Sequence, residues 1–298
     1  MVSRPKYLFI RLLEACNAGC FMCGYANSRD RFRFERAQLD ELLPQAADIN
    51  VRYVRFTGGE PLLHRDIVGL VEGATANGME TSIITNGMLL PKMAEGLAAA
   101  GLKQVVVSID GSSASTHDEY RKLRGCFDRA LEGLARARSL GIRTRVNTVV
   151  GPHNYQQMPE LKAILTTLSV DHWELSALKL PGSKSRYPDI SDVLRIGEII
   201  YEPPKPIPMG KKWYGDDPHE QTRFFEFGLP PRPSGPVCHV ADDVLYVDGR
   251  NGEVTCCSCI SHHPKVTEFA APLYAESGDM LLASPPLARQ RQYFKVMG

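Results

Sequence analysis

The chain lacks an excess of charge of either sign, and it lacks a long hydrophobic run. Its 298 residues carry 35 Lys and Arg against 34 Asp and Glu, a formal net charge of +1. This balance gives no electrostatic basis for binding nucleic acid or an acidic membrane. The first apolar run, Tyr7 to Leu13, is interrupted at Arg11 and is too short for a signal peptide or a membrane span. We therefore expect a cytoplasmic protein without a nucleic-acid or membrane partner.

The chain also lacks the ligand spacing of an ordinary zinc site around its first cysteines. Cys16, Cys20 and Cys23 are spaced CxxxCxxC, but the next cysteine is Cys126, and no histidine precedes His64. Structural zinc usually takes four ligands in two close pairs, so zinc, like a set of plain buried thiols, is the weaker interpretation. Three thiolates suit a [4Fe-4S] cluster whose fourth iron is left open to bind and activate a small molecule.

Cysteine usage as a whole argues against a disulfide framework. The chain has 8 cysteines, and in a protein expected in the reducing cytoplasm they indicate metal or redox chemistry. All but one of them fall in two clusters. The exception is Cys126, which we expect to be a small buried hydrophobe on a helix.

A second motif, TGGEP at residues 57–61, follows the apolar run 53–56. Gly58 and Gly59 let the backbone approach a ligand closely, and Glu60 can accept hydrogen bonds from an ammonium group. Alone, the motif could be no more than a turn at the end of a strand.

Together, CxxxCxxC and TGGEP, at the ends of successive predicted strands, resemble the radical S-adenosylmethionine (SAM) superfamily. The resemblance implies that Cys16, Cys20 and Cys23 ligate a [4Fe-4S] cluster, and that Gly58, Gly59 and Glu60 contact the methionine end of SAM. It also implies that an electron from a flavodoxin- or ferredoxin-type reductant cleaves SAM. The resulting 5'-deoxyadenosyl radical then abstracts hydrogen from the substrate.

Residues 1–180 alternate short apolar strands with amphipathic helical stretches, which predicts an α/β fold with a parallel sheet. The predicted strands are 7–13, 53–56, 81–85, 104–109, 143–149 and 172–178, and the predicted helices are 36–49, 66–77, 91–100, 126–140 and 156–168. Six strand–helix steps are too few to close an eight-stranded barrel. The resemblance implies an open, partial (β/α)6 TIM-like barrel, followed by a small C-terminal β-hairpin domain for an auxiliary cluster.

Polar side chains follow the predicted strands at the carboxyl ends, where parallel α/β folds bind ligands. Asn86, Ser108, Asp110 and Asn147 are our candidates for reading the ribose, carboxylate and adenine of SAM. Asn-Gly and Asp-Gly are also ordinary turn dipeptides, so a purely local role stays open.

The late part of the chain has a different composition. Residues 181–236 are rich in proline but contain many aromatic side chains, so we expect an ordered segment that covers the open side of the barrel. Residues 237–298 begin with two β-rich runs around a Gly-containing turn, which predicts a hairpin.

Cysteines lie at the outer ends of this hairpin, which resembles half of a SPASM or twitch domain. The resemblance implies that Cys238, Cys256 and Cys259 ligate an auxiliary [4Fe-4S] cluster. No cysteine follows Cys259, so the fourth position is open to Cys257, to a histidine at 262 or 263, or to substrate. Cys257 is also a catalytic candidate, as a hydrogen-atom donor to a substrate radical. A zinc site with one histidine is the simpler alternative.

The strings RLLEACN at 11–17, YVRFTGGEP at 53–61 and CH at 238–239 resemble the small radical SAM enzymes of sugar-containing antibiotic pathways, with the cytosylglucuronate decarboxylases as the best match. This implies hydrogen abstraction from the sugar ring of a nucleoside uronic acid, followed by loss of CO2. Lys179, just beyond a predicted strand end, is the catalytic candidate that would face the carboxylate.

Two other reactions use the same first step. An aminoglycoside or sugar epimerase or dehydrogenase would favour an acidic pocket, and acidic residues do occur at 216–220 and 242–243. A peptide-modifying enzyme often carries a SPASM domain. No leader-peptide-binding domain is expected before Tyr7, which counts against that reading.

Overall fold

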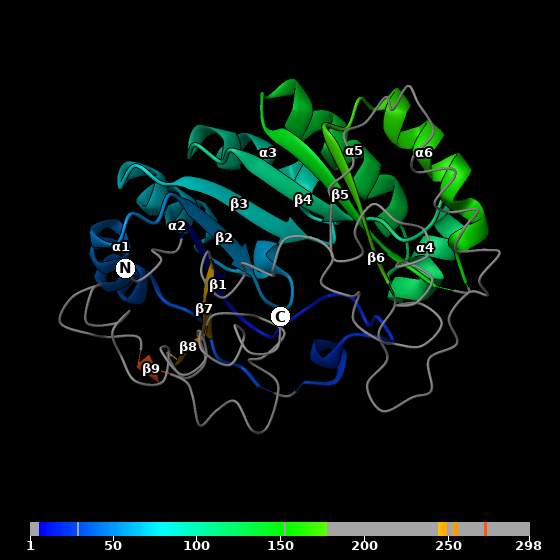
Figure 1. Cartoon of the computed structure of the whole chain (residues 1–298). Helices are drawn as coiled ribbons and strands as arrows, with labels where there is room; N and C mark the ends of the chain where they lie inside the picture. Colours follow the sequence, from blue (N-terminus) through cyan, green and yellow to red (C-terminus); the bar gives the residue numbers. More distant parts are fainter. Residues whose placement is uncertain are drawn as a thin grey trace, which may run out of the picture.

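A computed structural model describes residues 6–28, 30–151, 153–177, 244–248, 253–255 and 271–272. Its centre is one open sheet, in which seven neighbouring strands of the described chain run parallel and two more are antiparallel (Figure 1). The strands are β1 (Tyr7–Arg11), β2 (Tyr53–Thr57), β3 (Glu80–Thr85), β4 (Gln104–Ser108), β5 (Arg143–Val150), β6 (His172–Ala177), β7 (Val244–Asp248), β8 (Glu253–Thr255) and β9 (Ala271–Pro272). Their spatial order is β6-β5-β4-β3-β2-β1-β7-β8-β9. The predicted α/β class and all six strands of the first 180 residues are confirmed.

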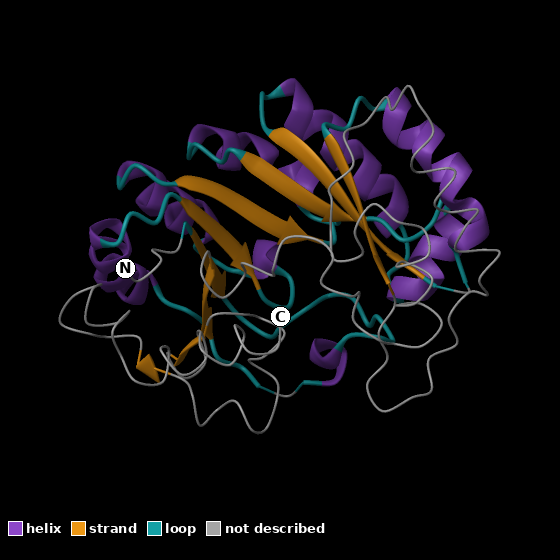
Figure 2. Cartoon of the chain, in the orientation of Figure 1, coloured by secondary structure: helices purple, strands orange, loops and turns teal. Residues whose placement is uncertain are grey.

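Helices connect the parallel strands and pack on one face of the sheet (Figure 2). They are α1 (Arg36–Asp48), α2 (Ile67–Ala76), α3 (Leu90–Ala99), α4 (Ala114–Arg121), α5 (Cys126–Ser139) and α6 (Met158–Thr167). Short 3₁₀ turns occur at Gly24–Asn27, Pro61–Leu63 and Tyr155–Gln157. The five predicted helices are confirmed. No helix of the described residues is long and apolar enough to cross a membrane.

The helix α4 was not predicted, because it has too few apolar residues to show a helical period. It buries His117, Tyr120 and Arg121, two of which are polar or charged. Its start is a local signal: the side chain of Ser113 accepts a hydrogen bond from the backbone N–H of Thr116. Because polar residues occupy buried positions of α4, its sequence lacks the apolar period that indicates a helix.

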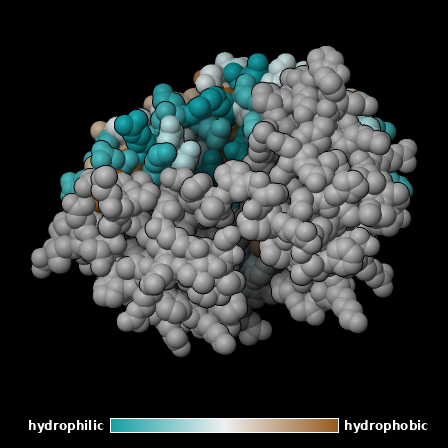
Figure 3. All heavy atoms as spheres, viewed as in Figure 1, coloured by the Kyte–Doolittle hydropathy of each residue, from teal (hydrophilic) through white to brown (hydrophobic). Residues whose placement is uncertain are grey.

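Alternation along the strands separates an apolar face from a polar one. On β1 and β2, Leu8, Ile10, Val54 and Phe56 are at most 1 % exposed and belong to the core beneath the helices. Successive side chains of a strand point to opposite faces. The register therefore puts these residues on the other face, which we call the inner face: Tyr7, Phe9, Arg11, Tyr53, Arg55, Ser82, Gln104, Ser108, Arg143, Arg145, Asn147 and Glu174. Described residues visible over β3 and β4 are mostly hydrophilic (Figure 3).

The predicted hairpin is present as the antiparallel pair β7 and β8, but its surroundings were not foreseen. All five residues of β7 pair in parallel with β1, from Tyr7 opposite Val244 to Arg11 opposite Asp248. The hairpin therefore extends the main sheet. The domain boundaries at 180 and 236 stay predictions, because residues 178–243 lie outside the described residues.

Candidate functional site

Three free thiols lie in the loop that follows β1. Cys20 is buried, and Cys16 and Cys23 are half-buried. In the part of the chain that the structure describes, no three metal-ligating side chains converge on one point. A cubane cluster does not need such convergence, because each thiolate binds a different iron atom. Three free, shielded thiols in one loop therefore fit a [4Fe-4S] cluster better than a single metal ion.

Burial governs the protonation of these thiols. It raises the pKa of Cys16 to about 11, and it raises the pKa of Cys20, against which the nearby Arg121 guanidinium acts. Both side chains are therefore protonated thiols near neutral pH. Because metal ligation needs thiolates, loading iron into this loop releases protons and becomes more favourable as the pH rises.

The TGGEP loop lies directly against the cysteine loop. Three backbone hydrogen bonds join them, from Leu12 N to Thr57 O (2.8 Å), from Gly59 N to Leu13 O (2.7 Å) and from Glu60 N to Ala15 O (2.9 Å). A Cβ on Gly58, whose φ is +139°, would lie 2.4 Å from Leu13 O, and one on Gly59 would lie 2.3 Å from Ala15 O. The expected close approach is therefore present, and the backbone approached is that of the cysteine loop.

We expect Gly59→Ala to reduce SAM cleavage roughly 100-fold or more, because the added methyl group must push the cysteine loop away from the TGGEP loop. The measurement is 5'-deoxyadenosine formed by the reduced, cluster-loaded protein. Gly24→Ala is the matched control. This glycine follows Cys23, and a Cβ there meets nothing within 4 Å. Equal activity of the two variants would contradict the role given to Gly59.

Glu60 is the acidic residue of the motif, and only 2 % of it is exposed. Its carboxylate accepts hydrogen bonds from Leu62 N (3.0 Å), Thr85 Oγ1 (2.6 Å) and Asn86 N (2.8 Å). Burial raises its pKa, while these three donors act in the opposite direction. Asn86 in turn donates from Nδ2 to Asn17 Oδ1 in the cysteine loop (2.8 Å). Glu60 and Asn86 thus tie the ends of β2 and β3 to that loop.

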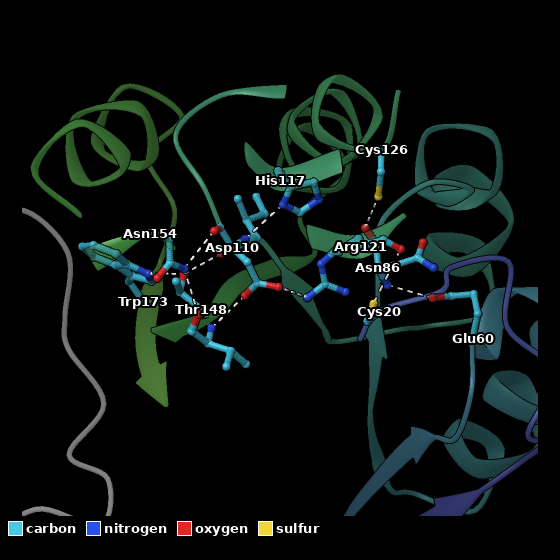
Figure 4. Close-up of polar contacts among 12 residues, drawn as sticks. Cys20, Glu60, Asn86, Asp110, His117, Arg121, Cys126, Thr148, Asn154 and Trp173 are labelled. Carbon is cyan, nitrogen blue, oxygen red and sulfur yellow. Dashed lines mark hydrogen bonds and ion pairs between the residues drawn. The ribbon is translucent and has the colours of Figure 1, made fainter. Parts of the chain in front are cut away.

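Asp110, at the end of β4, forms a buried ion pair with Arg121 at the end of α4 (Figure 4). Arg121 Nη2 lies 2.6 Å from Asp110 Oδ2, and Asp110 Oδ1 accepts from Val149 N at 2.7 Å. The carbonyl of Arg121 accepts from Gly19 N (2.9 Å) and contacts Cys20 Sγ (3.9 Å). Burial opposes the charge of Arg121, but the adjacent Asp110 carboxylate outweighs it and raises the pKa of Arg121. The ion pair therefore fixes the end of α4, where the carbonyl of Arg121 contacts the cysteine loop.

The backbone of Asp110 is also held by side chains. Its N–H donates to His117 Nδ1 (3.0 Å), and its carbonyl accepts from Asn154 Nδ2 (2.9 Å). Burial lowers the pKa of His117 to about 3, with Arg121 acting in the same direction. His117 is therefore neutral near pH 7, with Nδ1 available as the acceptor.

Ser108 and Asn147 are neighbours on the inner face, because they are paired in the register of β4 and β5. Both are partly exposed. They lie toward the carboxyl end of the sheet, where the sequence predicts contacts with SAM. The other predicted site residues lie outside the described residues and stay predictions: Lys179, Cys238, Cys256, Cys257 and Cys259.

Sequence reasoning missed Arg121 and Asn17. Asn17 lies inside the CxxxC spacing, where we considered only the cysteines. Arg121 gave no signal in the sequence. It lies 11 residues after its partner Asp110, and the two side chains meet only when the turn and the helix α4 between them have folded.

Comparisons with known proteins agree with this geometry. The model of the Radical SAM superfamily matches residues 10–164, more than half of the chain. An AdoMet-dependent heme synthase of Methanosarcina barkeri is 29% identical over 207 residues, which are 68% of this chain and 59% of that protein. A probable GTP 3',8-cyclase of Saccharolobus solfataricus is 31% identical over 205 residues, 66% of each. The chain thus spans less than two thirds of the length of these relatives.

A solved structure of Streptococcus suis SuiB bound to S-adenosylmethionine has the same fold. The TM-score is 0.77 at 21% identity, and the match covers 98% of this chain and 68% of SuiB. The family model covers both loops described above, from the end of β1 into α6. The chain belongs to the radical SAM superfamily, whose members use a [4Fe-4S] cluster and SAM.

Proposed function

We propose that this chain abstracts a hydrogen atom from the sugar ring of a nucleoside uronic acid and decarboxylates it, as a step in antibiotic biosynthesis. The observation that carries the first half of the proposal is the junction of the cysteine loop and the TGGEP loop through three backbone hydrogen bonds. When bound, the cluster and SAM supply a 5'-deoxyadenosyl radical. The resemblance of residues 11–17, 53–61 and 238–239 to cytosylglucuronate decarboxylases supports the second half.

The residues of the chain have separate tasks in this proposal. Cys16, Cys20 and Cys23 hold the cluster, and the buried position of Cys20 limits access of water to it. Glu60 and Asn86 keep the TGGEP loop at a fixed distance from the cysteine loop. A rigid junction of this kind matters because radical abstraction requires the reacting atoms to be held in near-contact geometry.

The net change in the substrate replaces a carboxylate by hydrogen. One hydrogen atom leaves with 5'-deoxyadenosine, CO2 departs, and a proton takes its place. The remaining radical is quenched by an electron and a proton, or by a hydrogen atom, for which Cys257 is the candidate donor. In the second case an electron and a proton return the Cys257 thiyl radical to the thiol. The electrons come from a flavodoxin- or ferredoxin-type reductant. Lys179 is the candidate that orients the carboxylate, and an auxiliary cluster at Cys238, Cys256 and Cys259 is the candidate electron relay.

A nucleotide substrate is the second candidate. Two relatives named GTP 3',8-cyclase or probable GTP 3',8-cyclase are 32% and 31% identical to this chain, over 176 and 205 residues. A nucleoside uronic acid and a nucleotide share a base, a sugar ring and an anionic group. The likeness to SuiB is a likeness of fold at 21% identity, so peptide modification has weaker support. An aminoglycoside epimerase or dehydrogenase stays an alternative.

We expect the reduced, cluster-loaded protein, given SAM and cytosylglucuronic acid, to form one equivalent of 5'-deoxyadenosine and a product lighter by one CO2. Mass spectrometry of parallel incubations with GTP and with an aminoglycoside panel separates the alternatives. A product of GTP would favour nucleotide chemistry. Loss of two hydrogens, or a product of unchanged mass, would favour dehydrogenation or epimerisation.

A further inference from the structure

The inner face of the sheet carries four arginines in its described strands, on β1, β2 and β5. Three of them have a carboxylate partner among the described residues, namely Arg11 with Glu14, Arg143 with Glu80 and Arg145 with Glu174. The fourth, Arg55 on β2, forms no ion pair with a described residue. Among the described residues, the inner face therefore has a positive charge without a carboxylate partner at one position.

The neighbours of Arg55 hold it in place without neutralising it. Its Nε donates to Ser82 Oγ (2.9 Å), its Nη2 donates to Gln104 Oε1 (3.2 Å), and its guanidinium carbon lies 5.2 Å from the centre of the Phe9 ring. Burial lowers the pKa of Arg55. A guanidinium fixed by neutral partners in a partly buried position is costly unless an anion completes its environment.

Arg145 on β5 is a second guanidinium, near enough to Arg55 for the two positive charges to repel each other. Burial, and after it the charge of Arg55, lowers the pKa of Arg145 to about 10. Its side chain is 20% exposed, against 3% for its partner Glu174, and its Nε has no hydrogen-bond partner among the described residues. Among the described residues, Glu174 is thus paired with Arg145, and the charge of Arg55 adds to that of the Arg145–Glu174 pair without a carboxylate of its own.

The position of this charge relative to the cysteine loop is set by the strands. Arg55 lies two residues before Thr57, where β2 leads into the TGGEP loop, and Arg145 lies two residues before Asn147. Residues two apart on a strand lie on the same face, one step further along it. Arg55 therefore lies one step before the carboxyl end of β2. The register sets Arg55 level with Ser82, Gln104 and Arg143, so Arg145 lies one step further than Arg55 toward the carboxyl edge, and both arginines are on the inner face.

We propose that Arg55 and Arg145 form a subsite for an anionic oxygen group, a carboxylate or a phosphate, on the substrate of this enzyme. The proposal rests on the proposed function and narrows its substrate class to anions. A polycationic aminoglycoside would be repelled by the same two side chains. Two N–H groups of Arg55 already donate to Ser82 and Gln104, so only the remaining N–H groups of the guanidinium are available to the anion. A partial hold suits a carboxylate that must later leave as CO2.

Equilibrium binding to the cluster-loaded, unreduced protein with SAM present tests this subsite without turnover. The probes are cytosylglucuronic acid, its neutral carboxamide and GTP. Because a hydrogen bond to a charged group contributes about 1.5–3 kcal/mol, Arg55→Met is expected to weaken binding of an anionic probe roughly 10- to 100-fold. Binding of the carboxamide is expected to stay unchanged. Arg143→Met is the matched control, since Arg143 lies on the same face but is exposed and paired with Glu80.

The outcomes separate this inference from the decarboxylase proposal. Binding of GTP but not of the uronic acid, with the same dependence on Arg55, would support the subsite with phosphate as its ligand and would contradict decarboxylation. Equal affinity for the acid and the carboxamide, or no binding of either anionic probe, would overturn the subsite. So would a loss of SAM affinity in Arg55→Met, since the anion would then be the carboxylate of SAM. Arg55→Lys keeps the charge, and thermal melting shows whether each variant is folded.

Discussion

Cys16→Ala protein is expected to form no 5'-deoxyadenosine, because the cluster cannot be held with an iron open to SAM once one of its three thiolates is removed. If the auxiliary cluster exists, anaerobically reconstituted wild-type protein should contain about eight iron atoms per chain and the variant about four. Iron analysis and the assay for 5'-deoxyadenosine are the two measurements. A wild-type value near four iron atoms per chain would contradict the predicted auxiliary cluster at Cys238, Cys256 and Cys259 and would leave the prediction of the first cluster standing.

Cys126→Ala is the matched control for this experiment. Cys126 is fully buried at the start of α5, and its thiol donates to the carbonyl of Asn86 at 3.3 Å. It is close to the site but belongs to no predicted ligand set. We expect the variant to retain its iron and SAM cleavage with a modest loss of stability. SAM cleavage by the Cys16→Ala protein would show that this loop does not hold the cluster.

The fold was predictable wherever the pattern is local. Each of the six strands is a short run whose alternate residues enter the core beneath the helices, and the helices α1, α2, α3, α5 and α6 have apolar residues at helical spacing. The helix α4 was missed because it buries polar residues. The position of β7 beside β1 was missed because parallel pairing joins segments far apart in the chain, and no property of residues 244–248 alone specifies their neighbour.

The candidate site was predictable only as far as its two motifs. CxxxCxxC and TGGEP are contiguous strings, and each has a chemical reason for its residue types. What links them is not contiguous: the carboxylate of Glu60 reaches the end of β3, and Asn86 reaches Asn17 across 69 residues. Whether an arginine has a carboxylate partner among the described residues, as Arg145 does and Arg55 does not, depends on which strands become neighbours. Such information exists only after folding.

Asp110→Ala is expected to destabilise the protein by about 3–5 kcal/mol, because it leaves the buried guanidinium of Arg121 without its carboxylate. It also removes the acceptor of the Val149 N–H. The measurement is the free energy of unfolding from chemical denaturation. Glu132→Ala is the matched control, since it breaks the exposed Arg129–Glu132 pair on α5 and should cost less than about 1 kcal/mol.

The double variant Asp110→Leu with Arg121→Met separates stability from function. Replacing both charged partners by apolar residues should recover most of the lost stability, because no buried charge is left unpaired. The carbonyl of Arg121, which accepts from Gly19 and contacts Cys20, belongs to the backbone and is retained in the double variant. Recovery of both stability and SAM cleavage would assign the pair a purely structural role. Recovery of stability without SAM cleavage would show that the guanidinium itself acts on the cysteine loop. A single variant Asp110→Ala as stable as Glu132→Ala would contradict the central position given to this ion pair.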